Sequence, residues 1–169
     1  MKNTVLHYST YSAITICSLF LMGWFIFDGF SYSFQEIIGY ASMIISLAFV
    51  FFGIKHYRDV ENQGMLSFKQ GLLIGILITL FASIAFGLLD MIYVKYINPD
   101  FTTEYYNYYI EKMRTSLSPS EFETELEKIE AQKELFSNSF LSFLLMFATV
   151  FIIGFIISLI SGLILQRKN

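Results

Sequence analysis

Four long apolar runs constrain the fold of this chain more than any other feature of its sequence. They cover residues 11–27, 37–54, 71–94 and 140–165. A helix needs roughly 20 apolar residues to cross about 30 Å of hydrocarbon. Buried helices of a soluble protein would show a polar stripe every three to four residues, and these runs lack one. The runs therefore predict four transmembrane helices.

The composition agrees with lipid as the solvent of most of the chain. Hydrophobic residues make up 55% of the sequence and charged residues only 15%, whereas soluble domains carry about a quarter charged residues. A net charge of −3 gives no basic face for a nucleic-acid partner. Cys17 stands alone, so no intramolecular disulfide can form. We expect one membrane domain spanning residues 1–169.

A cleavable signal peptide is the alternative for the first run, because Lys2 provides a basic residue ahead of it. The run is long and aromatic, and no A-x-A-like cleavage site follows it. We therefore expect it to be retained as a membrane-spanning helix.

Basic residues in the short connections predict the orientation of the chain. The connection 28–36 has no Lys or Arg, whereas the connection 55–70 has Lys55, Arg58 and Lys69. Basic residues also occur near both chain ends: Lys2, Arg167 and Lys168. We expect both termini in the cytoplasm and the third connection outside it.

The third connection, at about 99–137, has the pattern of a helical hairpin. Its first part is rich in tyrosines (Tyr105, Tyr106, Tyr108 and Tyr109), which suit a membrane interface or, alternatively, a ligand-stacking platform. In its second part Ser118, Pro119 and Glu121 form a helix-start signal with a capping box. An apolar face and many glutamates follow. Nothing there resembles a calcium loop, so a solvated acidic face is expected.

Small residues recur at every fourth position in the last two runs. They are Gly71, Gly75, Thr79, Ser83 and Gly87 in the third run, and Gly154, Ser158 and Gly162 in the fourth. Such stripes let helix backbones approach closely in lipid. They predict packing of the third span against the fourth, with a homo-oligomer as the alternative.

Ionisable residues within spans often mark transport paths. Asp90 is the best candidate here, with Lys95 and Tyr93 nearby in sequence; a hydrated carboxylate at the interface is the plain alternative. Asp28 and Glu36 flank the short second connection. Together with Asp90 they suggest an acidic outer cluster, which would be an ion-entry vestibule if the protein conducts anything.

The stretch "KHYRDVEN" after the second run is dense in polar groups, yet it favours an anchor over an active site. Its basic residues and Tyr57 suit the headgroup zone, and a docking role for His56, Arg58 and Asp59 stays open. A zinc site built on His7 and His56 would need a further ligand from Asp59 or Glu61. No H-e-x-x-H, G-x-S-x-G or phosphate-loop motif occurs. We predict no catalytic, cofactor or metal site.

The block "EIIGYASMIISLAFVFFGIKHYRD" and the later "SFKQGLLIGILITL", "PDF" and "IISLISGLIL" carry a family pattern. Over almost its whole length the chain resembles domain-of-unknown-function family 4199. The resemblance implies a four-helix integral membrane protein of Gram-negative bacteria with no assigned activity.

These observations predict an all-α polytopic membrane protein with an extracytoplasmic helical hairpin between its third and fourth spans. We expect it in the bacterial inner membrane, in contact with lipid. The expected role is structural or partner-binding and not enzymatic, with the acidic outer hairpin as the contact surface for a protein. A small transporter or channel subunit, with a homo-oligomeric form, is the alternative.

Overall fold

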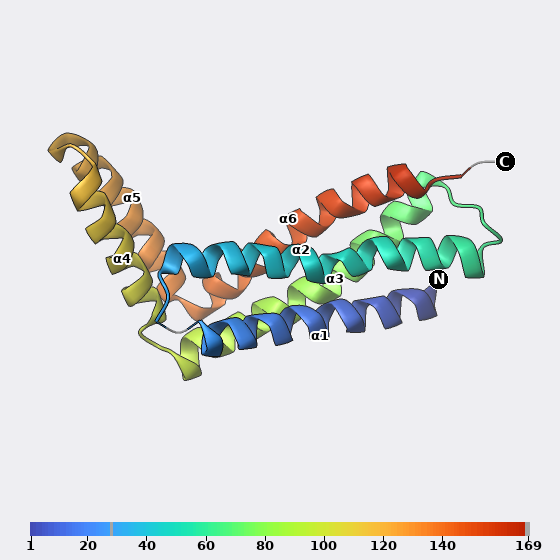
Figure 1. The fold of residues 1–169 in the computed structure, drawn as a ribbon, viewed down its shortest axis with the longest axis horizontal. Coiled ribbons are helices and arrows are strands. Elements are labelled where there is room, and N and C mark those ends of the chain that lie inside the picture. Colours follow the sequence, from blue (N-terminus) through green and yellow to red (C-terminus); the bar gives the residue numbers. More distant parts are fainter. Residues whose placement is uncertain (28, 168–169) are drawn as a thin grey trace. The chain divides into compact units, whose positions relative to one another are not determined.

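The computed structural model describes residues 1–27 and 29–167, and their regular secondary structure is helical (Figure 1). In chain order the elements are α1 (Lys2–Ile26), α2 (Tyr32–His56), the π-helical turn η1 (Tyr57–Glu61), α3 (Phe68–Ile92), the π-helical turn η2 (Tyr93–Ile97), α4 (Phe101–Ser116), α5 (Pro119–Ser137) and α6 (Ser139–Leu165). Four helical segments are long and apolar enough to cross a membrane: α1, α2 with η1, α3 with η2, and α6. The predicted all-α membrane fold is confirmed.

The helices extend beyond the apolar runs that predicted them. α1 begins at Lys2, well before the run at residue 11, because residues 2–10 contain neither Gly nor Pro. Thr4 and Ser9 in this extension are buried, so tertiary contacts support it. Two helices, α4 and α5, fill the third connection as expected.

The chain divides into two compact units. The first consists of Met1–Phe86 and Met146–Asn169, and the second of Gly87–Leu145. The first unit therefore contains α1, α2 and most of α3 and α6. The second contains the α4–α5 hairpin with the adjoining ends of α3 and α6.

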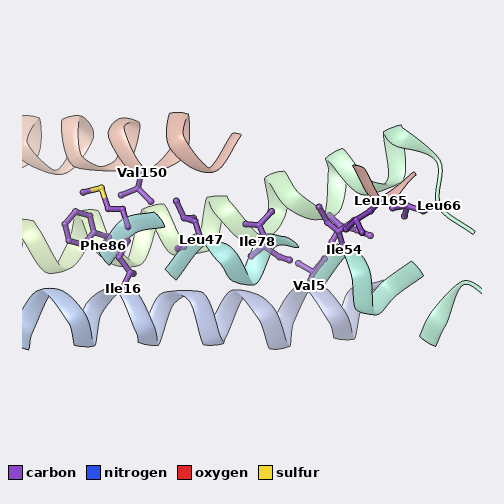
Figure 2. Packing of buried hydrophobic residues seen from close by; sticks show 13 residues of the cluster. Val5, Ile16, Leu47, Ile54, Leu66, Ile78, Phe86, Val150 and Leu165 are labelled. Carbon is purple, nitrogen blue, oxygen red and sulfur yellow. The ribbon is translucent and has the colours of Figure 1, made fainter. Parts of the chain in front are cut away.

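The core of the first unit is a line of apolar side chains shared by its helices (Figure 2). Ile16, Leu47, Ile54, Ile78 and Val150 are each fully buried there. Large apolar side chains on the outside are instead exposed, as shown by Phe25 and Ile37 at 67% and Ile164 at 66%. An apolar outer surface of this kind is suited to lipid.

Small hydroxyl side chains fill much of the interior between α1 and α2, which lie side by side in Figure 1. Ser12 Oγ donates to the carbonyl oxygen of Ser46 across the two helices at 2.9 Å, and Ser46 Oγ donates to Ser42 O in its own helix at 2.7 Å. Helices in lipid associate through close packing and such bonds rather than through hydrophobic drive. The serines therefore hold α1 against α2.

The small-residue stripes of α3 and α6 lie against each other in the first unit. A Cβ atom added at Gly71 would lie 3.2 Å from the Cα of Gly162, and one at Gly75 would lie 2.6 Å from Ser158 Cβ. A Cβ atom added at Gly154 would lie 2.6 Å from Thr79 Oγ1. The structure thus uses these stripes inside one chain.

In the second unit α4 and α5 form a hairpin closed by contacts between the two helices. The rings of Tyr106 and Phe136 lie 6.1 Å apart, and Lys133 Nζ donates to Asn107 Oδ1 at 3.3 Å. The predicted capping box of α5 is confirmed, because Glu121 Oε2 accepts from Ser118 Oγ at 2.6 Å and from Ser118 N at 3.2 Å. The apolar side of α5 packs on α4, which leaves its acidic side outward.

Candidate functional site

A buried carboxylate–hydroxyl pair joins α3 to α6 in the second unit. Asp90 is 6% exposed and Ser142 is 2% exposed. Ser142 Oγ donates to Asp90 Oδ2 at 2.6 Å, which is a short, charge-assisted distance when the acceptor is ionised. One turn earlier, a Cβ at Gly87 would lie 2.9 Å from Phe143 Cδ2. The absence of a side chain at Gly87 therefore permits the close helix approach that this hydrogen bond needs.

The surroundings of Asp90 differ from what its sequence neighbours suggested. Lys95, considered above as its partner, is exposed, and its ammonium lies 5.2 Å from the centre of the Tyr96 ring. Within the described ranges, no Lys or Arg forms an ion pair with Asp90. The partner is Ser142, which is 52 positions away in sequence and carries no signal that would identify it before folding.

The other members of the suggested acidic vestibule are not brought to Asp90 by any described contact. Glu36 is half-buried on α2 in the first unit, and Asp28 lies outside the described residues. The vestibule stays a prediction. No group of three or more metal-ligating side chains occurs in the part of the chain that the structure describes.

Arg58 and Asp59 form a bidentate ion pair at the end of α2. Arg58 Nε lies 2.6 Å from Asp59 Oδ1, and Arg58 Nη2 lies 3.1 Å from Asp59 Oδ2. Arg58 Nη1 also donates to Leu165 O at 3.4 Å, so it satisfies a carbonyl at the end of α6. Its side chain is 11% exposed. Arg58 is thus occupied with structure, and His56 packs its ring 5.6 Å from that of Tyr8.

Both chain ends meet the α2–α3 connection at this end of the first unit. Leu66 and Arg167 pair through their backbones, with N–O distances of 3.1 and 2.8 Å. The amino group of Met1 and the hydroxyl of Thr4 both contact the Glu61 carboxylate. The sequence analysis missed these contacts because they join segments far apart in the chain.

One side of α5 presents four glutamates to solvent. Glu123, Glu127, Glu130 and Glu134 follow each other at spacings of four, three and four residues, so they share one face; all four are exposed. We call them the acidic stripe. Within the described residues none of them forms an ion pair or hydrogen bond.

The lysines of α5 are turned elsewhere. Lys128 Nζ lies 2.6 Å from Glu125 Oε1, outside the acidic stripe, and Lys133 reaches Asn107 on α4. The acidic stripe therefore keeps its full negative charge.

Together these features define an α-helical multi-pass membrane protein with a helical hairpin inserted between its last two membrane-length helices. The chain belongs to the family described as "Protein of unknown function (DUF4199)", whose model matches residues 7–167. No curated protein and no solved structure gave a significant match.

Proposed function

We propose that this chain is a non-catalytic, partner-binding protein of the bacterial inner membrane. Its outer hairpin provides the contact surface, and the acidic stripe on α5 carries the interaction. The partner is a protein segment rich in Lys and Arg, because opposite charge is what an unpaired row of carboxylates recognises. Both termini face the cytoplasm.

The acidic stripe supports this proposal because it works against the helix that bears it. Like charges at spacings of three and four residues repel and destabilise a helix. The pairs Glu123–Glu127 and Glu130–Glu134 have this spacing, with no cation between them. Local rules are most often broken where a surface serves another purpose. A basic partner would relieve the repulsion.

A photo-crosslinking residue at exposed Ala131, beside the acidic stripe, tests the proposal in native membranes. We expect an adduct with one defined partner that Glu127→Gln with Glu130→Gln abolishes. The matched control is Glu111→Gln with Glu125→Gln, which removes the same charge outside the stripe and should keep the adduct. Equal loss in both variants would reduce the effect to net charge and refute the site.

The orientation has its own test. In a Cys17→Ser background, a maleimide that cannot cross membranes should label Ser116→Cys from outside intact cells and leave Ser67→Cys unlabelled. The reverse pattern would place the hairpin inside the cell and remove an extracytoplasmic partner.

A small transporter or channel subunit is the second candidate, and the Asp90–Ser142 pair favours it. Ionisable groups buried in membrane helices often belong to a transport path, and Asp90 is 94% buried because only 6% of it is exposed. Flux measured in proteoliposomes with Asp90→Asn tests this reading. An unchanged flux, or a strictly monomeric purified protein, would argue against it.

A further inference from the structure

Cations from two distant parts of the chain gather around Asp59 in the first unit. Arg58 pairs with Asp59 directly. The backbone pairing between Leu66 and Arg167 fixes the end of the chain beside the α2–α3 connection. Lys55 and Arg167 both lie within electrostatic range of the Asp59 carboxylate. Three cations therefore surround a single anion.

The charge in this cluster is not balanced. Arg58 neutralises Asp59 and is turned inward onto Leu165. Lys55 and Arg167 are exposed. Within the described ranges neither side chain forms an ion pair or a hydrogen bond. Two positive charges thus remain available to a ligand.

The position of the cluster selects the ligand. Lys55 belongs to the last turn of α2, and Arg167 follows the end of α6, so both lie where membrane-length helices leave the hydrocarbon. Lipid headgroups occupy this level, and half-buried Tyr57 beside them is typical of it. The density of phosphate is higher there than anywhere in solution.

We propose that Lys55 and Arg167, organised around Asp59 by the Leu66–Arg167 pairing, bind the phosphate headgroup of an anionic phospholipid. This site is independent of the acidic stripe and of any protein partner. Arg58 is a positioning residue: it holds Asp59 and the end of α6 in place and leaves lipid contact to the two exposed cations.

The size of the effect follows from the charges. One Lys or Arg close to an anionic membrane surface strengthens binding by about fivefold, and two by about 25-fold. Salt weakens such contacts because it screens exposed charges. Arg167 pairs with Leu66 through its backbone, so substitution of its side chain leaves this pairing intact.

The test compares lipid binding by native mass spectrometry of the full chain, using phosphatidylglycerol and phosphatidylcholine with the same acyl chains. We expect tighter binding of phosphatidylglycerol, and Lys55→Gln with Arg167→Gln should weaken it by about 25-fold. The control Lys112→Gln with Lys128→Gln removes the same charge from the second unit and should change it by less than about twofold.

Several outcomes would overturn the proposal. They are equal affinity of the wild type for the two lipids, equal weakening in the control, and displacement of the lipid by inorganic phosphate, which would assign the site to a soluble anion. If the double variant fails to fold, Lys55→Arg with Arg167→Lys keeps both charges and must retain the preference for phosphatidylglycerol. Loss of the preference there would equally refute a site based on charge.

Discussion

Substituting Gly75 by alanine should separate the contribution of helix contact from that of helix propensity. The new Cβ would lie 2.6 Å from both Cβ and Oγ of Ser158 and 3.2 Å from its Cα. Because a backbone atom is among these neighbours, the side chain of Ser158 cannot relieve the overlap alone. α3 and α6 must move apart.

The magnitude follows from two opposing terms. An alanine in place of glycine favours a helix by about 0.5–1 kcal/mol, and overpacking of a well-packed site costs about 1–3 kcal/mol. Gly39→Ala provides the control, because its Cβ would lie 3.5 Å from Phe20 Cζ, an ordinary contact. Both changes carry the same propensity gain. Gly75→Ala should therefore be less stable than Gly39→Ala by about 1–3 kcal/mol.

Reversible unfolding in mixed micelles, driven by SDS, would measure this difference. Ser158→Gly combined with Gly75→Ala removes the overlapping atoms, so the pair should show a favourable coupling of about 0.5–3 kcal/mol. Equal stability of the two alanine variants, or the absence of rescue, would refute close packing of α3 on α6. Loss of an oligomer with unchanged unfolding would move the stripes to an interface between chains.

Three further predictions concern the second unit. Ser142→Ala should destabilise the protein by about 1–3 kcal/mol in the same unfolding assay, because it leaves the buried Asp90 carboxyl without its donor; unchanged stability would contradict the pairing. Burial raises the pKa of Tyr106 from 10.0 to about 12, so the stability that its neutral phenol provides is complete below pH 10 and is lost as the pH rises toward 12. Ultraviolet titration of Tyr106→Phe should lack this late component, and its persistence would assign it elsewhere. The Ser118 side chain and backbone hold the pKa of Glu121 below its ordinary 4.5, so this stabilisation of α5 is present above that pH and is lost as the pH falls through the lowered pKa. Hydrogen exchange in the first turn of α5 should then accelerate in acid, and Ser118→Ala should show the faster exchange already at neutral pH.

Features that depend on local sequence were predictable. Span length, the helix start at Ser118 and the regular stripe from Gly71 to Gly87 each follow from residues within one helix. The start of α1 was placed too late, because a hydropathy pattern detects lipid-facing residues and not the polar first turns of a helix. Residues such as Thr4 are held there by contact with Glu61, which only folding supplies.

Features that depend on distant segments could not be read from the sequence. The pairing of Asp90 with Ser142 and the contact of Arg58 with Leu165 join residues from different helices. The π-helical turn η2 has no pattern of its own; it is visible only in its wider backbone bonds, such as Asn98 N to Tyr93 O at 2.9 Å. The residues that carried chemistry were thus identifiable, while their partners were not.

The two proposed binding surfaces differ in sign, and this decides how they can be told apart. The chain is able to pair its own charges, as Lys128 and Glu125 do in α5, so the unpaired acidic stripe is not a consequence of missing cations. The same holds for Lys55, which stays exposed while Arg58 takes Asp59. Salt would weaken both surfaces equally. Lipid composition would not: anionic lipid competes with no ligand of the acidic stripe and should leave a basic partner bound, whereas a basic peptide should displace nothing from Lys55 and Arg167.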